Sequence, residues 1–133
     1  MTDRYHKTVS ESNVLTDDNK VKEAVAAILA ANLEQARTAD VYRLIFSSID
    51  LTTLNATDSP SSVARFTERV NDFETDHGDL PSVAAICVYP NFAPVVRTVL
   101  DVTEVKIACV SGGFPSSQTF PEVKVAETAL AVE

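Results

Sequence analysis

The sequence of 133 residues lacks long apolar runs, and it lacks the glycine patterns of nucleotide-binding loops. No apolar stretch approaches the roughly 20 residues that a membrane-spanning helix needs. The polar start at residues 1–6 has no apolar centre of the kind found in a secretory signal. Only 3 glycines are present, and none forms a Gly-x-Gly-x-x-Gly or P-loop spacing. These absences predict a cytoplasmic protein that neither contacts a membrane nor binds nucleotides through those motifs.

Concentrated positive charge is also missing. The net charge is −8, and the 11 Lys and Arg residues form no cluster. Basic groups that release counterions supply most nonspecific affinity for nucleic acid, so we expect no nucleic-acid partner. A phosphorylated substrate would be repelled at long range. Any binding of a phosphate would therefore need local positive groups, and the sequence shows none.

Cysteine and histidine are scarce and widely spaced. Cys87 and Cys109 both sit in apolar stretches, which favours buried thiols over a disulfide or a metal pair in a reducing compartment. His6 and His77 lie far apart in polar surroundings. Because no residues have metal-ligand spacing, we expect no structural zinc site.

The first third of the chain indicates helices. Residues 1–15 read as a loose polar arm, and Thr16 is placed to cap a helix whose first turn carries Asp17 and Asp18 as favourable charges, not as a general acid/base pair. Thr38 is placed to cap a second, short helix. Apolar residues recur on one side of each expected helix: Val21, Val25, Ile28, Leu29 and Leu33 on the first, and Val41, Leu44 and Ile45 on the second. We assign residues 1–45 to an N-terminal helical arm.

From residue 46 onward, strands and helices are expected to alternate. The patterns predict strands at 46–51, 83–88 and 105–110, of which the second and third are continuous apolar runs typical of strands buried on both faces. Helices are predicted from Asp58-Ser59-Pro60 to about Asp76, from about residue 91 to Leu100, and from Pro121 onward. This order favours an α/β fold with a parallel sheet and right-handed crossovers.

The pattern also indicates an incomplete fold. The last expected helix has no capping glycine or following proline before Glu133. Three parallel strands would leave two open sheet edges, whereas a complete doubly wound domain usually carries about five or more strands. We therefore expect the chain to be a fragment of a larger domain.

Four segments carry a family resemblance. They are residues 49–55 (IDLTTLN), 83–90 (VAAICVYP), 105–115 (VKIACVSGGFP) and 122–128 (EVKVAET). In this order and at these spacings they resemble the first three βα units of class I deoxyribose-phosphate aldolase. The resemblance covers residues 46–133 and implies the N-terminal (βα)₃ portion of a TIM (β/α)₈ barrel, with the two helices preceding it.

The resemblance also implies a chemistry. The family, which acts in deoxyribonucleotide catabolism, cleaves 2-deoxy-D-ribose 5-phosphate reversibly to glyceraldehyde 3-phosphate and acetaldehyde through a lysine Schiff base, without metal or organic cofactor. Its reactive lysine, its proton-handling aspartate and second lysine, and its phosphate-binding loops lie on later strands. A typical barrel needs about 250 residues, so we expect this chain to lack the catalytic groups and to be inactive alone.

Five positions are expected to line the active site. Asp50 is predicted to end the first strand, where the matching family aspartate helps to order the lysine and the proton network; a simple turn aspartate is the alternative. Thr52 and Leu54 follow in the loop on the substrate side. Cys87 is predicted at the carboxyl end of the second strand, where barrels build their sites, and a buried apolar role is its alternative. Tyr89 shares the parity of Cys87 along the strand and is expected to face the same cavity.

Lys106 is the only lysine expected inside a strand, which makes it a candidate for the reactive amine. It lies four residues before Val110, about 13 Å from the catalytic rim at 3.3 Å per residue. We therefore expect it to be structural and to pair with an acid in the lower layers of the barrel. Cys109 has the opposite parity and is expected to face the helices. Gly112 and Gly113 are expected to allow a sharp exit from the third strand, with a phosphate cradle as the alternative.

Two other functions stay open on the sequence alone. The first is a non-catalytic half-barrel that pairs with itself, as a homo-oligomer, or with a complementary chain through its open strand edges. The second is a small flavodoxin-like or receiver-like domain with Asp50 as an acidic site, which the small number of strands and the lack of a paired acid disfavour.

Overall fold

A computed structural model describes residues 4–12 and 17–132, so the predicted cap Thr16 lies outside the described residues. Contacts divide the chain into two compact units, Met1–Val41 and Tyr42–Glu133. The predicted domain boundary between residues 45 and 46 stays a prediction, because compact units are not themselves evidence of separate domains. None of the described helices is both long enough and apolar enough to cross a membrane.

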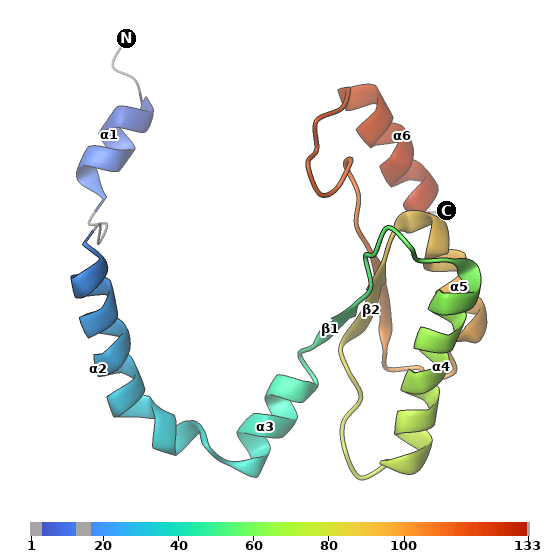
Figure 1. Cartoon of the computed structure of the whole chain (residues 1–133), viewed down its shortest axis with the longest axis horizontal. Helices are drawn as coiled ribbons and strands as arrows, with labels where there is room; N and C mark the ends of the chain where they lie inside the picture. Colours follow the sequence, from blue (N-terminus) through green and yellow to red (C-terminus); the bar gives the residue numbers. More distant parts are fainter. Residues whose placement is uncertain (1–3, 13–16, 133) are drawn as a thin grey trace. The chain divides into compact units, whose positions relative to one another are not determined.

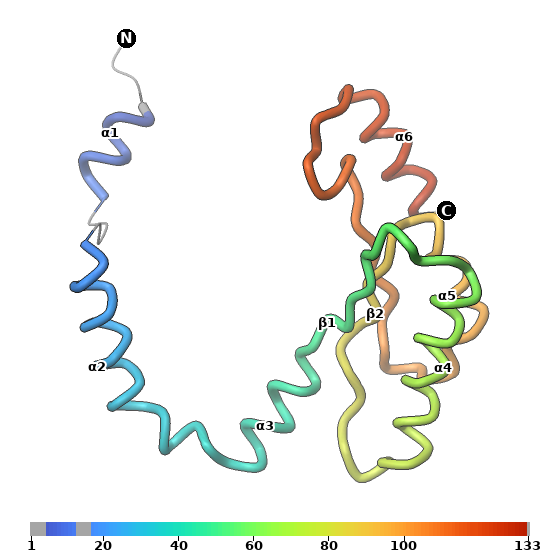
Figure 2. Tube along the Cα trace, in the orientation of Figure 1, coloured from blue at the N-terminus to red at the C-terminus, as the bar shows by residue number. Residues whose placement is uncertain are grey.

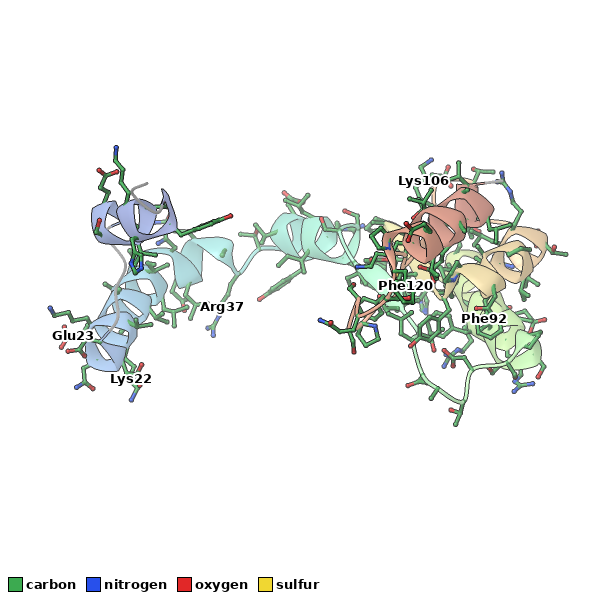
Figure 3. The ribbon with its side chains drawn as sticks, turned by 90° about the horizontal axis from the view of Figure 1, so that it is seen from above. Lys22, Glu23, Arg37, Phe92, Lys106 and Phe120 are labelled. Atoms are coloured by element: carbon green, nitrogen blue, oxygen red, sulfur yellow. The ribbon has the colours of Figure 1, made fainter. Side chains whose placement is uncertain are left out.

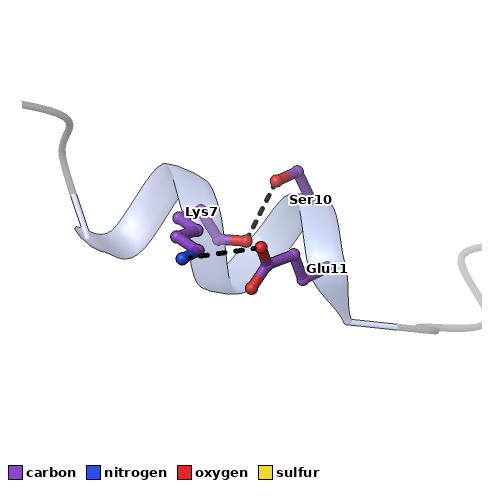
Figure 4. Close-up of polar contacts among 3 residues, drawn as sticks. All are labelled: Lys7, Ser10 and Glu11. Atoms are coloured by element: carbon purple, nitrogen blue, oxygen red, sulfur yellow. Dashed lines mark hydrogen bonds and ion pairs between the residues drawn. The ribbon is translucent and has the colours of Figure 1, made fainter.

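The first unit consists of helices. Helix α1 spans Arg4–Glu11 and carries an ion pair of 3.8 Å between Lys7 Nζ and Glu11 Oε1. The Ser10 hydroxyl donates to the Lys7 carbonyl at 2.9 Å, as Figure 4 shows. Helix α2 spans Asp18–Ala36 and begins at Asp17, whose carboxylate accepts from the backbone N–H of Asn19 and Lys20. Asp17 is therefore the N-cap, one residue after the predicted cap, and only Asp18 lies in the first turn as a favourable charge, as predicted.

Helix α2 buries no residue, although its apolar side chains recur at helical spacing as predicted. The exposed fractions run from 39% to 62%. The residues concerned are Val21, Val25, Ile28, Leu29 and Leu33. The apolar periodicity therefore predicted the helix correctly. Within the described residues, however, no part of the chain buries this apolar face.

Helix α3 spans Ala39–Phe46, and the Thr38 hydroxyl accepts from the Val41 N–H at 3.3 Å, which confirms the predicted cap. The strand predicted to begin at residue 46 is wrong at its start. Phe46 instead closes the helix and stacks on Phe73, with ring centroids 5.2 Å apart. The chain then turns, and strand pairing begins at the Ile49 carbonyl, which accepts from the Ala84 N–H at 2.9 Å.

The second unit contains a parallel sheet of three strands in the order β1-β2-β3. Figures 1 and 2 label its first two strands, β1 and β2. The strands are β1 (Asp50–Thr52), β2 (Ala85–Val88) and β3 (Lys106–Cys109), each shorter than the sequence predicted. Residues 50, 85 and 106 lie in one register row, and residues 52, 87 and 108 lie in another. The predicted parallel α/β fold is confirmed.

Four helical elements complete this unit: α4 (Pro60–Asp76), the 3₁₀ turn η1 (Pro90–Phe92), α5 (Ala93–Val99) and α6 (Pro121–Val132). Helix α4 begins where predicted, because Ser59 and Ser62 bond reciprocally and Pro60 supplies a preset φ at the first position. The Asn71 amide bonds the Val99 carbonyl and the Asp101 N–H, so it ties α4 to the end of α5.

The core lies between one face of the sheet and the helices α4 and α5, which Figure 1 shows on the same side of the strands. Ile86, Val88, Val63 and Val96 are 0% exposed. Phe92, labelled in Figure 3, is 9% exposed and closes this core at η1. Strand residues of one parity thus pack in the core under α4 and α5. Residues of the other parity lie on the opposite face of the sheet.

Candidate active site

The strand register defines two faces of the sheet. The helix face carries Leu51, Ile86, Val88, Ile107 and Cys109, which share the parity of the buried core. The opposite face, here named the polar face, carries Asp50, Thr52, Ala85, Cys87, Lys106 and Ala108. Three of the five predicted lining residues therefore come together on one face, and Lys106 lies on that face with them. As predicted, Cys109 lies on the helix face.

The position of Asp50 differs from the prediction. Asp50 opens β1 instead of ending it, because the helix before it extends to Phe46 and delays the strand. In the register it lies level with Ala85 and Lys106, and two residues before Thr52. The Asp50 side chain is exposed, so its carboxylate is available to the polar face from a lower row than expected.

Thr52 and Cys87 lie in the same register row at the upper end of the polar face. Cys87 is 8% exposed, and this burial raises the pKa of its thiol above the usual value. The nearby Asp50 carboxylate raises the pKa further, whereas a hydrogen bond with Thr52 opposes the shift. The thiol therefore stays protonated at neutral pH, which argues against a nucleophilic role, because the thiolate is the reactive form.

Tyr89 and Leu54 meet above the sheet, beyond the ends of the first two strands. The Tyr89 hydroxyl donates to the Leu54 carbonyl at 3.3 Å. Tyr89 is half-buried and also packs against the hydrophobic core, so its ring links the core to the loop that follows β1. Whether these two residues line a substrate cavity stays a prediction.

Sequence reasoning missed a polar network in the loop between β1 and α4. The Asp58 carboxylate accepts from the Thr53 hydroxyl at 2.9 and 3.1 Å and from the Asn55 N–H at 3.0 Å. The Asn55 amide also donates to the Thr53 hydroxyl at 3.1 Å, and the Thr53 N–H donates to the Cys87 carbonyl at 3.0 Å. An Asn and an Asp three positions apart directly after a strand form a recognisable turn signal. This network holds the loop that follows β1 in place beside the end of β2.

The loop from β3 to α6 has its own fixed geometry. Gly112 and Gly113 adopt φ of +74° and +76°, which confirms the predicted use of glycine at the exit from the strand. The Gly113 N–H donates to the Glu127 carboxylate at 2.9 Å, and the hydroxyls of Ser111 and Thr128 lie 2.6 Å apart. Because the Gly113 amide is already bonded to a carboxylate, this loop does not offer that amide to a phosphate.

No lysine occupies the upper end of the polar face. All 5 lysines of the sequence fall in described segments: Lys7 in α1, Lys20 and Lys22 in α2, Lys106 at the start of β3, and Lys124 in α6. Shallow open grooves run along α6 and α4, and neither is lined by a predicted site residue. Within residues 4–12 and 17–132, no three His, Cys, Asp or Glu side chains are placed to hold a metal ion.

Comparison with known proteins identifies relatives of this chain. No protein-family model matches it. A putative deoxyribose-phosphate aldolase from Caenorhabditis elegans is 33% identical over 121 residues, which cover 87% of this chain and 38% of that protein. The crystal structure of a putative deoxyribose-phosphate aldolase from Coccidioides immitis superposes with a TM-score of 0.54 at 24% identity, covering 68% of this chain and 32% of that chain.

The two similarities agree with the fold and with the order of its elements. The chain spans a little more than a third of the length of the curated relative. The structural likeness confirms that the three parallel βα units are a portion of a TIM barrel. By sequence and by fold, the chain is thus a relative of the deoxyribose-phosphate aldolases and corresponds to a portion of their length.

Proposed function

We propose that this chain forms part of the active-site wall of an aldolase that cleaves 2-deoxy-D-ribose 5-phosphate, reversibly, to glyceraldehyde 3-phosphate and acetaldehyde through a lysine Schiff base. The grouping of Asp50, Thr52 and Cys87 on one face of a sheet whose relatives are aldolases carries the proposal. Two free thiols fit a cytoplasmic setting for this chemistry.

The wall residues have distinct roles in this proposal. Asp50 supplies a carboxylate that can hold or move a proton, as the iminium chemistry of a Schiff base requires. Thr52 and Cys87 supply neutral hydrogen-bonding groups in the row above it. Tyr89 and Leu54 form the rim, held together by the hydroxyl-to-carbonyl bond of 3.3 Å. The sugar phosphate would contact this wall through its carbon chain, because none of the five described wall residues is basic.

The reactive amine is proposed to come from outside these 133 residues. A Schiff-base lysine must reach the carbonyl carbon of a substrate that also touches the wall residues. Lys106 starts β3 in the lower, Asp50 row of the polar face, whereas the reactive lysine of the family that the sequence resembles lies on a later strand. The other four lysines lie on helices, and none is in a strand. The chain alone is therefore proposed to be inactive.

Turnover of 2-deoxy-D-ribose 5-phosphate by the purified chain, alone and mixed with a chain that covers the missing strands, tests this proposal. We expect no activity alone and measurable activity on mixing. Borohydride trapping with acetaldehyde, followed by peptide mass spectrometry, should label a lysine of the added chain only. Label on Lys106 would overturn the assignment of the amine, and a correctly folded mixture without activity would overturn the proposed function.

A non-catalytic half-barrel that self-associates, or that pairs with a complementary chain, is a second candidate. One observation favours it: among the described strands β1 and β3 each pair only with β2, so each has an unpaired edge that can template another strand. Size-exclusion chromatography separates the two candidates. A defined dimer that gives no turnover with the complementary chain would support the half-barrel, whereas turnover on mixing supports the aldolase.

A further inference from the structure

The polar face carries two charged side chains, and they lie in the same register row. Asp50 pairs with Ala85 in β1–β2, and Ala85 pairs with Lys106 in β2–β3. Partners in a parallel register project to the same side of the sheet. Asp50, Ala85 and Lys106 therefore form a straight row across three strands, with an acid at one end and a base at the other.

The spacing of this row suits an ion pair. Neighbouring strands lie about 4.8 Å apart, so the two outer Cα atoms are about 10 Å apart. The residue between them is alanine, which leaves the space above β2 open to a long side chain. In the next row, the β3 residue on the polar face is Ala108, which pairs with Cys87. Its small side chain leaves room for the lysine stem. An extended lysine and an aspartate can span such a gap together.

Neither charge is occupied elsewhere in the described chain. Both side chains are exposed, and the described ion pairs are Lys7–Glu11 and Arg37–Glu34, each within a single helical segment. Lys106, labelled in Figure 3, is free to change rotamer because its four-carbon stem is flexible and its end is in solvent. Closing the pair therefore breaks no described interaction.

We propose that Lys106 reaches across Ala85 to the Asp50 carboxylate and is the positioning residue for that group in the proposed aldolase site. The positioning role depends on the proposed function, whereas the pairing of the two charges depends only on the strand register. It gives Lys106 a task other than forming a Schiff base. Holding the carboxylate toward β3 also offsets the field that Asp50 exerts on the thiol one row above.

Cys87 is a natural reporter of this pairing, because Asp50 acts on it electrostatically. The other titratable group that acts on the thiol is Cys109, which lies on the helix face. The rate of Cys87 alkylation by iodoacetamide, measured by peptide mass spectrometry from pH 7 to 10, reports the thiolate fraction. Cys109 is quantified in the same digests as an internal reference.

A double-mutant cycle tests the pairing. We expect K106M to slow alkylation of Cys87 by about twofold, the scale of an exposed ion pair, and 0.5 M salt to remove the difference. In a D50N background, K106M should have no effect, and K106R should behave as wild type. K124M, on α6, is the matched control and should leave the rate unchanged.

Two outcomes would overturn the pairing. If K106M changes the rate equally with and without Asp50, Lys106 acts on the thiol directly and not through the carboxylate. If it changes neither rate while unfolding temperatures are unaltered, the two charges do not interact. Both readouts are independent of turnover, so failure of the aldolase proposal on mixing and failure of the pairing are distinguishable.

Discussion

The two faces of the sheet differ although the same three short strands build both. On the helix face, Ile86 and Val88 are fully buried against α4 and α5. On the polar face, Asp50 and Lys106 are exposed, and Ala85 lies between them. The difference predicts that the helix face contributes more to stability than the exposed part of the polar face, so substitutions on the two faces should differ in their effect on unfolding.

The largest effect should come from the helix face. Ile86→Ala should lower the free energy of unfolding by about 2–5 kcal/mol, because it removes a fully buried side chain and leaves a cavity. Asp50→Asn, on the polar face, is the matched control and should change stability by less than about 0.5 kcal/mol. Urea unfolding of both variants measures the contrast. Equal losses of unfolding free energy in the two variants would show that the two faces do not differ in their contribution to stability.

An intermediate effect should come from the loop that leaves the sheet at β3. Gly113→Ala should destabilise by about 1–3 kcal/mol, because φ of +76° disfavours a side chain and the new Cβ would lie 2.9 Å from Thr119 Cγ2. Gly78→Ala is the control, since its added Cβ would meet only the Glu74 carbonyl oxygen, at 3.5 Å. Thermal unfolding compares the stability of the two variants. If Gly78→Ala lost as much stability as Gly113→Ala, the steric argument would be contradicted.

The smallest effect concerns the polar face and depends on pH. The pKa of the Cys87 thiol is raised in the folded state, so its contribution to stability is present below the unfolded pKa, near 8.5, and is lost as pH rises through the folded pKa. The free energy of unfolding should therefore fall above about pH 8.5. Cys87→Ala should show a flatter profile there. Parallel profiles for variant and wild type would mean that the thiol does not contribute.

Much of the fold could be predicted from the sequence because local signals were strong. Ser59-Pro60 fixed the start of α4, and the apolar runs located β2 and β3 to within about two residues. The start of β1 could not be predicted. Phe46 reads equally well as the end of an amphipathic helix or the beginning of a strand, and its contact with Phe73, 27 positions later, decides the matter.

The candidate site was predictable in composition but not in arrangement. Parity placed Asp50, Thr52 and Cys87 on one face, which follows from the alternation of side chains along a strand. The level of Asp50 within the sheet depended on the misplaced start of β1, so the row that it shares with Lys106 could not be seen. The anchoring role of Asp58 also stayed hidden, because its carboxylate reads equally well as part of the start of α4.

The self-contained network of Thr53, Asn55 and Asp58 has a consequence for how this region can diverge. The side chains of Thr53, Asn55 and Asp58 are bonded at fixed separations in sequence, so an inserted or deleted residue between positions 53 and 58 would unpair several of them at once. Exchange of Leu54, Ala56 or Thr57 at constant length carries no such cost, because their side chains are not part of this network. Drift in this segment should therefore proceed by replacement of residues outside the network, without a change in length.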